Sequence, residues 1–201
     1  MAAQENYGNK IIPKMRKILS LISISVLILF AVFIFVNVFF MQSYKIPTTS
    51  MVPTLMPGDK IAVNKIIYGP RIPFLSVRLP GLKKPDRGEV IVFISPADRT
   101  KAYIKRLIAS SGERLSIKDG NVYVNGKIMV DPRIARNYYY NQGEYAKSSK
   151  EIVVPEGKYF FMGDNSISSL DSRFWGFVDK KDIVGKAIFI WWPPKRVGMI
   201  E

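Results

Sequence analysis

Hydroxyl side chains gather in a proline-rich part of the chain, residues 46–59. Four hydroxyls lie there between three prolines: Thr48, Thr49, Ser50, Thr54, Pro47, Pro53 and Pro57. Serine is common in proline-rich connections, so a simple linker is one interpretation of this segment. The other is that Ser50 is the nucleophile of an acyl-transfer site, which requires a base to remove its hydroxyl proton.

The base cannot be histidine, because the chain contains none. A carboxylate or a neutral lysine must serve instead, and a lysine pKa near 10.4 has to fall by roughly 3 units, worth about 4 kcal/mol, which burial usually causes. If residues 102–108 form a strand, Lys105 shares one face with Tyr103 and Leu107. No serine has a lysine three residues after it, so Ser50 and Lys105 must meet across the fold.

A third segment, residues 162–177, is denser in polar and aromatic side chains than a loop requires. Its Gly163-Asp164-Asn165 run suggests a tight turn. Asp171 and Arg173 are placed to form an ion pair that fixes the loop, and the Ser169 hydroxyl could orient a neutral lysine amine. A calcium loop is the alternative, but the D-x-[DN]-x-[DN]-G pattern is absent.

Residues 18–41 form an apolar run of 24 residues without a charge, enough to cross a bilayer core of about 30 Å. A buried core helix and a cleaved signal sequence are the alternatives, although the run is long for a signal sequence and no A-x-A site follows. Lys10, Lys14, Arg16 and Lys17 precede the run and only Lys45 follows it closely. The positive-inside rule therefore predicts a cytoplasmic tail at 1–17, a transmembrane helix at 18–41 and an outer domain at 42–201.

The outer domain is predicted to be mainly β, because short apolar runs alternate with Gly, Pro, Asn and Asp. The expected strands lie within residues 88–93, 102–108, 121–130, 159–162 and 184–192, with a hairpin turn at Asn125-Gly126. Residues 131–150 are interpreted as a variable excursion. Residues 68–81 are either a hairpin resting on the membrane surface or a loop that covers the domain's own core.

The charge and the missing cysteines narrow the function further. Without cysteine there is no disulfide, no thiolate nucleophile and no Cys-bearing zinc site. The net charge of +14 would suit nucleic acid in a soluble protein, but the basic residues are scattered and form no run. Only four of the 30 lysines and arginines precede Lys45, so the excess belongs to the domain, where anionic lipid would favour it.

Six short blocks follow one another along the chain: Ser50-Met51-x-Pro53-Thr54-Leu55, Gly58-Asp59, Arg87-Gly88-Glu89-Val90-Ile91-Val92-Phe93, Tyr103-Ile104-Lys105-Arg106, Gly163-Asp164-Asn165 and Asp171-Ser172-Arg173-x-Trp175-Gly176. In this order they resemble type I signal peptidase, the bacterial leader peptidase, in its compact single-anchor form. The resemblance runs from the anchor to about Trp192.

The resemblance implies roles for residues near the serine. Ser50 would be the acylating nucleophile and Lys105 its general base. The Ser50 backbone N–H and the Thr48 hydroxyl would form the oxyanion hole, worth about 2.7 to 4 kcal/mol per donor in comparable sites. Ser169 would position the Lys105 amine.

It also implies a supporting shell, a substrate pocket and a substrate class. Asp171 and Arg173 would hold the active-site loop. Shallow apolar pockets would accept a small-x-small motif and be lined by Tyr44, Ile46, Met51, Leu55, Val92 and Ile104. The implied fold is largely antiparallel β, and no metal or cofactor is expected.

The implied function is a serine endopeptidase of the plasma membrane that removes signal peptides from exported preproteins at the outer face. Its partners would be those preproteins, the lipid bilayer and the protein export machinery, and nucleic acid would not be among them. Two other functions compete. One is a self-cleaving protease of the SOS-repressor kind, which also uses a Ser/Lys dyad. The other is a catalytically silent membrane adaptor that binds anionic lipid or acidic partners.

Overall fold

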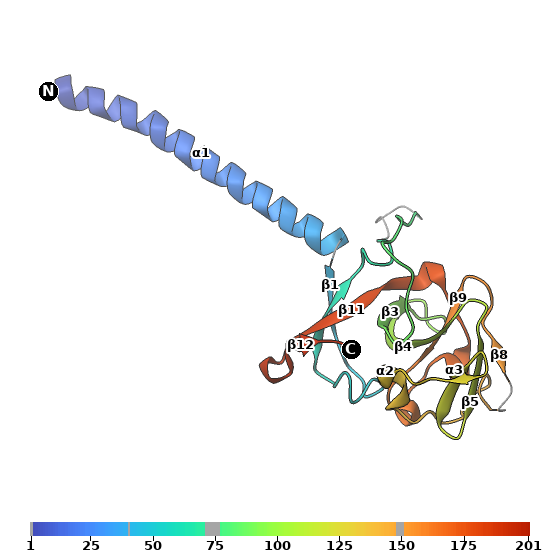
Figure 1. Cartoon of the computed structure of the whole chain (residues 1–201). Helices are drawn as coiled ribbons and strands as arrows, with labels where there is room; N and C mark the ends of the chain where they lie inside the picture. The colour runs from blue at the N-terminus through green and yellow to red at the C-terminus, as the bar shows by residue number, and fades with distance from the viewer. Residues whose placement is uncertain (1, 40, 71–76, 148–150) are drawn as a thin grey trace. The chain divides into compact units, whose positions relative to one another are not determined.

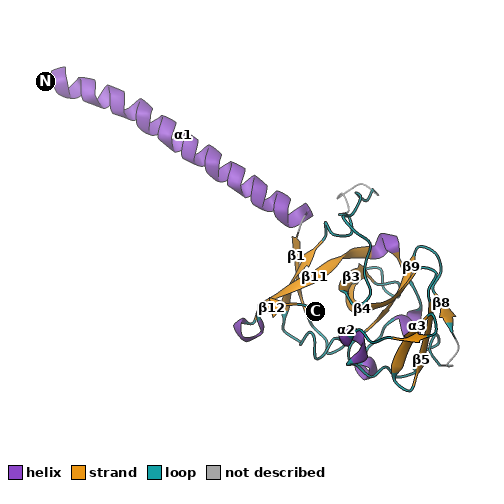
Figure 2. Cartoon of the chain, in the orientation of Figure 1, coloured by secondary structure: helices purple, strands orange, loops and turns teal. Residues whose placement is uncertain are grey.

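The structure of the chain is a computed structural model that describes residues 2–39, 41–70, 77–147 and 151–201. The chain divides into two compact units, residues 1–38 and 39–201 (Figure 1). The first unit is helical and the second is built mainly from strands, which Figure 2 shows in orange.

The first unit consists of one long helix, α1 (Ala2–Phe39). Its stretch Met15–Ile34 spans 20 residues with a mean hydropathy of 2.6, and none of it is buried. At 1.5 Å per residue this stretch is roughly 30 Å long, which matches a bilayer core. Among the described residues, α1 is the one helix long and apolar enough to span a membrane. The predicted span 18–41 runs past the end of α1, because Met41 already belongs to a strand.

The second unit contains a large antiparallel sheet with the strand order β1-β2-β11-β3-β4-β9-β10, and β12 pairs with β11. Its strands are β1 (Met41–Lys45), β2 (Lys60–Asn64), β3 (Val90–Ile94), β4 (Ala102–Ser110), β9 (Lys158–Met162), β10 (Val178–Asp179), β11 (Ile183–Trp192) and β12 (Gly198–Met199). The prediction of a mainly β, antiparallel domain is therefore confirmed.

A smaller antiparallel sheet has the order β7-β6-β5-β8. It comprises β5 (Arg114–Lys118), β6 (Asn121–Val124), β7 (Lys127–Ile128) and β8 (Ile152–Val153). The helices of this unit are short: α2 (Pro132–Ala135), α3 (Ser172–Trp175) and single turns at 166–168, 180–182 and 194–196. Asn125 and Gly126 both have positive φ, as a two-residue hairpin turn requires, so the predicted turn is confirmed.

Strand β3 lies at the centre of the core because both of its faces are buried. Val90 and Val92 pack into a cluster with the Ser50 segment, β2 and β11. Ile91 and Phe93 point the other way, into a second cluster that includes Leu107 of β4. A third cluster fills the space beneath the smaller sheet. A run of β-branched and aromatic residues suits a strand that is buried on both faces.

Two segments that the sequence left open differ in how they pack. Residues 131–147 of the predicted excursion lie on the domain, with Ile134, Tyr139 and Ala146 buried in the third cluster; residues 148–150 lie outside the described residues. Of the segment 68–81, residues 71–76 also lie outside the described residues. The two interpretations of that segment as a whole therefore stay predictions.

Candidate active site

Ser50 lies in the loop between β1 and β2, and this loop is closed at its base. The Ile46 N–H donates to the Asp59 carbonyl and the Gly58 N–H donates to the Ile46 carbonyl, both at 2.8 Å. Met51 and Leu55 on the same loop are fully buried in the core. These anchors fix the backbone around Ser50, whose side chain is itself only 5% exposed.

Lys105 reaches Ser50 from strand β4. Its Nζ lies 2.6 Å from the Ser50 Oγ, within hydrogen-bonding distance, although the two residues are 55 positions apart. Lys105 is 5% exposed, and its Nζ lies 5.8 Å from the centre of the Tyr103 ring. The predicted meeting of these two side chains across the fold is present.

Burial lowers the pKa of Lys105 from its ordinary 10.5 to about 8, because the charged ammonium loses its hydration. The negative charges of Asp171 and Asp164 act in the opposite direction, and Arg173 adds to the lowering. At and above pH 8 a large share of the molecules therefore carries a neutral amine beside Ser50.

The Thr48 hydroxyl lies on the same side of the loop as the nucleophile candidate. Its Oγ1 is 3.3 Å from the Ser50 Oγ, and either oxygen can donate. Thr48 is exposed, so its hydroxyl is accessible to a bound peptide.

The turn at residues 163–165 holds the other side of the Ser50 loop. The Asn165 N–H donates to the Ser50 carbonyl at 3.1 Å, and the Asn165 Nδ2 donates to the Thr49 carbonyl at 3.2 Å. Gly163 packs so closely that a Cβ there would collide with the Ser169 Oγ and the Ser50 carbonyl oxygen. A residue without a side chain is therefore needed at position 163.

A fully buried ion pair joins β4 to this turn. The Arg106 guanidinium donates to both carboxylate oxygens of Asp164, at 2.7 and 2.6 Å, and both side chains are 0% exposed. The Thr54 hydroxyl also donates to Asp164, at 2.5 Å. Arg106 and Asp164 both lie in blocks of the family resemblance, but the sequence predicted no contact between them. The signal that could have found them is an arginine at a position of β4 whose alternation predicts burial.

The predicted ion pair of Asp171 and Arg173 is confirmed, at 2.8 Å with both side chains fully buried. Asp171 also accepts from the Gly163 N–H at 2.9 Å, which ties the pair to the turn beside Ser50. Arg173 donates to the Tyr140 carbonyl at 2.9 Å and to the Ser166 hydroxyl at 2.5 Å. Segment 131–147 thus supports the active-site loop, a contact that the sequence did not predict.

Ser169 is buried, 4% exposed, and its hydroxyl has no hydrogen-bond partner within the described residues. It lies against Gly163, next to the Ser50 carbonyl. The hydrogen bond from Ser169 to the Lys105 amine therefore stays a prediction. An unsatisfied buried hydroxyl in this position costs stability, and a functional role would account for it.

A cavity of about 480 Å³ opens beside Ser50 and Lys105. Of the six predicted pocket residues, Ile104 lines it; the other five pack with Ile104 in the core cluster below the Ser50 loop. Most of the cavity wall was not predicted from the sequence. It is formed by Pro47, Lys101, Ala102, Tyr103, Ser168 and Leu170. Leu170 is 53% exposed, and the signal that the sequence offered was an apolar residue between Ser169 and Asp171.

The site has no acidic or histidine cluster for a metal. Throughout the described part of the chain, no three His, Cys, Asp or Glu side chains are grouped so that they could bind an ion. The buried carboxylates of Asp164 and Asp171 are each bound by an arginine instead.

The chain is similar to proteins that are named as signal peptidases. Signal peptidase IB of Staphylococcus aureus is 35% identical over 181 residues, covering 85% of this chain and 87% of that protein. A Synechocystis protein named "Probable signal peptidase I-2" is 35% identical over 171 residues, covering 82% of this chain and 69% of that protein.

Among solved structures, a signal peptidase I from Enterococcus faecalis is 34% identical, covers 53% of this chain and 98% of that chain, and has a TM-score of 0.43. The family described as "Signal peptidase, peptidase S26" matches residues 18–192. The chain therefore belongs to the signal peptidase family of serine endopeptidases, whose members cleave signal peptides from exported preproteins.

Proposed function

We propose that this chain cleaves signal peptides with a Ser/Lys dyad, in which Ser50 is the nucleophile and Lys105 the general base. The observation that carries the proposal is the 2.6 Å separation of the Lys105 Nζ and the Ser50 Oγ. When the amine is neutral, the same two atoms can share a hydrogen bond in which the hydroxyl donates. The pKa of about 8 for Lys105 supplies that neutral amine near physiological pH.

In the first step the Ser50 Oγ attacks the carbonyl carbon of the scissile peptide bond while its proton passes to the Lys105 Nζ. The C–N bond then breaks, and the Lys105 ammonium returns the proton to the leaving amine. The products are the free mature protein and an ester between Ser50 and the signal peptide.

In the second step a water molecule attacks the ester carbonyl and gives a proton to the neutral Lys105 amine. The ester C–O bond breaks, and Lys105 returns the proton to the Ser50 oxygen. The signal peptide leaves with a new carboxyl terminus, and both side chains regain their starting states.

The Thr48 hydroxyl and the Ser50 N–H are proposed to donate to the oxyanion in both steps. Support comes from the position of the Thr48 Oγ1, 3.3 Å from the attacking oxygen. Ser169 is proposed to orient the Lys105 amine, and its buried hydroxyl, which lacks another partner among the described residues, is available to do so. Asp171 and Arg173 would hold the loop that carries Ser169.

Ile104, Tyr103 and Leu170 give the cavity beside the dyad an apolar part, which would contact the small side chains of a substrate. We therefore propose cleavage after a small-x-small motif. The other predicted pocket residues would shape the pocket from below, because they pack with Ile104: Tyr44, Ile46, Met51, Leu55 and Val92.

The proposed location is the plasma membrane, with residues 1–17 in the cytoplasm, residues 18–41 crossing the bilayer and residues 42–201 on the outer face. The apolar stretch of α1 and the four basic residues that precede residue 18 support this orientation. A preprotein still held by its signal peptide would share that surface, which raises the effective concentration of substrate. The export machinery would be the neighbouring source of such substrates.

The test is cleavage of a preprotein by the full chain in liposomes, comparing wild type with Ser50→Ala and Lys105→Ala. Each variant should lose a factor on the order of 10⁴ or more in kcat, as expected for residues that act as a unit. Lys127→Ala, which removes an exposed lysine of β7, is the matched control and should retain wild-type activity. Wild-type activity in either dyad variant would refute the assignment.

The pH dependence gives a second, independent readout. Since the neutral form of Lys105 is the active one, kcat/KM should rise with pH through a midpoint of about 8. A midpoint near 10.5 would show that Lys105 titrates as an ordinary exposed lysine and would contradict its role as base.

A further inference from the structure

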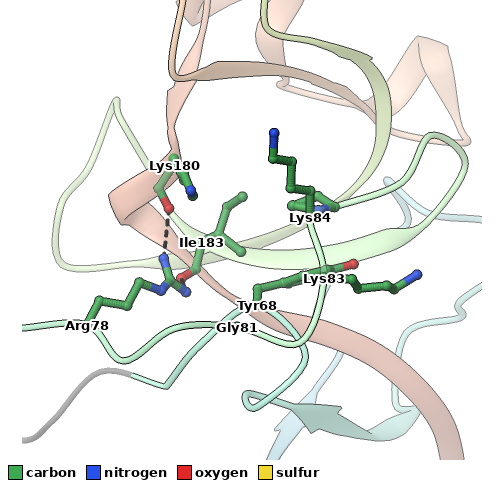
Figure 3. Close-up of a pocket in the computed structure, with 8 residues that line it drawn as sticks. Tyr68, Arg78, Gly81, Lys83, Lys84, Lys180 and Ile183 are labelled. Atoms are coloured by element: carbon green, nitrogen blue, oxygen red, sulfur yellow. Dashed lines mark hydrogen bonds between the residues drawn. The ribbon is translucent and has the colours of Figure 1, made fainter.

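A second cavity, of about 200 Å³, lies apart from the residues of the active site and has a strongly basic wall (Figure 3). Four of the eight residues that line it are cationic and none is acidic: Arg78, Lys83, Lys84 and Lys180. Tyr68 and Ile183 supply the apolar part of the wall. A recess with this composition favours an anion.

Arg78 is fixed in the wall by the backbone. Its Nε donates to the Gly69 carbonyl at 2.7 Å, and its two Nη atoms donate to the carbonyls of Lys180, at 2.7 Å, and Ile183, at 2.5 Å. Figure 3 shows the guanidinium of Arg78 facing the carbonyl of Lys180. These three carbonyl contacts hold the guanidinium in place, so a cationic group has a fixed position in the cavity wall.

The lysines differ in how they are engaged. The Lys83 Nζ binds the carboxylates of Asp86, at 2.6 Å, and Glu89, at 2.7 Å. Lys84 and Lys180, by contrast, form no ion pair with any acidic residue that the structure describes. In the view of Figure 3 their side chains lie on either side of Ile183, both above Arg78.

The acidic residues nearest to Lys180 in sequence are already engaged by other cations. Asp182 accepts two hydrogen bonds from Arg99, at 2.6 and 2.7 Å. Asp179 lies 3.6 Å from Lys158 and 3.8 Å from Lys181. Neither carboxylate is therefore a ready partner for the Lys180 ammonium, which can bind an external anion.

Exposed apolar side chains alternate with these cations along the same segment. Val77 is 54% exposed, Leu79 is 41% exposed and Leu82 is 80% exposed, and they flank Arg78 and Lys83. A soluble anion would gain nothing from such side chains. The acyl region of a lipid would, because an interfacial segment combines basic and apolar residues.

We propose that this recess binds the phosphate diester of an anionic phospholipid, with Lys84 and Lys180 contacting the phosphate, Arg78 supplying a fixed charge and Leu82 contacting the acyl region. The inference rests on the membrane location of the proposed function, and it adds a defined lipid site on the catalytic domain. A phosphate group fits a cavity of this volume, and lysines bind phosphate as point charges.

The test is a ³¹P NMR titration of the full chain in phosphate-free neutral detergent, with three ligands: dihexanoyl phosphatidylglycerol, dihexanoyl phosphatidylcholine and inorganic phosphate. The double variant Lys84→Gln/Lys180→Gln should weaken phosphatidylglycerol binding roughly 25-fold, at about fivefold per lysine. The double variant Lys118→Gln/Lys127→Gln removes the same charge from the smaller sheet and should change binding less than twofold.

Leu82→Ser distinguishes a lipid from a soluble phosphate, because it should weaken phosphatidylglycerol binding and leave inorganic phosphate binding unchanged. If both double variants lost phosphatidylglycerol binding equally, the loss would come from net charge alone, and the proposed site would be refuted. Inorganic phosphate binding as tightly as phosphatidylglycerol would overturn the lipid assignment, as would equally tight binding of phosphatidylcholine.

The same samples separate this inference from the proposed mechanism. Ser50→Ala should bind phosphatidylglycerol like wild type, and Lys84→Gln/Lys180→Gln should cleave a short soluble peptide in detergent at the wild-type rate. Loss of lipid binding in Ser50→Ala, or loss of peptide cleavage in the double variant, would show that the two sites are not independent.

Discussion

The catalytic domain contains two polar clusters in which a lysine has different hydrogen-bond partners. Lys105 is buried, and the group that its ammonium meets at 2.6 Å is the neutral hydroxyl of Ser50. Lys186 instead meets the buried carboxylate of Glu89 at 2.7 Å. The comparison teaches that a neutral lysine requires burial together with a partner that carries no charge. A carboxylate in hydrogen-bonding contact would keep the amine protonated.

The Glu89 cluster is the more heavily bonded of the two. Glu89 is 3% exposed and accepts from Lys186, Lys83, the Tyr68 hydroxyl and the Asp86 N–H. Burial alone would raise the pKa of Glu89, but these donors outweigh it and lower the pKa to about 2. The negative charge of Glu89 is therefore compensated by the lysines around it, and the role of the cluster is to stabilise the fold.

The largest change in stability is expected when the negative charge of Glu89 is removed. Glu89→Gln leaves Lys186 and Lys83 without their shared carboxylate and should lower the free energy of unfolding by about 3 to 5 kcal/mol at pH 7. Urea unfolding of the full chain in detergent measures this, with the exposed Glu156→Gln as control, expected within about 0.5 kcal/mol of wild type. A loss no larger than that of the control would show that the cluster contributes nothing.

The pH dependence of the same cluster has a defined sign. Because the folded-state pKa of Glu89 is below its ordinary 4.5, its stabilising contribution is present above that pH and is lost as the pH falls towards 2. The difference in stability between wild type and Glu89→Gln should shrink over this acidic range. A difference that stays constant down to pH 2 would contradict the low pKa.

The next largest effect is expected at Lys105, where a substitution should increase stability. Lys105→Met should raise the free energy of unfolding by about 3 kcal/mol at pH 6, because it removes a charge that burial disfavours and keeps a side chain of similar length. The folded-state pKa of about 8 is below the unfolded value of 10.5. The unfolded chain therefore binds more protons between these values, and the stability of wild type rises with pH across that window.

The gain from Lys105→Met should accordingly fall below about 1 kcal/mol at pH 10, where the folded-state amine is neutral and the unfolded-state amine is still partly protonated. Urea unfolding of wild type and variant at pH 6 and pH 10 checks both points. A variant that is less stable than wild type at pH 6 would show that Lys105 is stabilised in its charged form.

The sequence predicted the contact between Ser50 and Lys105 better than the contacts around it. The missing histidine and the alternation around Lys105 made that residue one candidate for the base, the family resemblance implied its pairing with Ser50, and the structure places the two side chains 2.6 Å apart. Strands β3, β4, β9 and β11 were predicted because runs of β-branched and aromatic residues indicate a strand even when its partner strands are unknown. Family membership also decides against the self-cleaving repressor and the silent adaptor.

The rest depended on tertiary contacts. Strands β1, β2 and β5 were not predicted, because each contains fewer apolar residues than β3 and is stabilised by pairing with its neighbours. The wall of the cavity could not be predicted either. Leu170 and Pro47 line it only because two loops, far apart in sequence, converge beside Ser50.

The smallest effect is expected for the same lysine-to-methionine change in the Glu89 cluster. It is also the most direct test of the comparison between the two lysines. Lys186→Met should lower the free energy of unfolding by about 1 to 2 kcal/mol at pH 6, since Glu89 loses one charged donor while Lys83 and Tyr68 still hold it. The same chemical change at Lys105 should raise stability under the same conditions. If both substitutions shift the urea midpoint in one direction, the partner of the lysine does not determine its charge, and the basis for a neutral Lys105 fails.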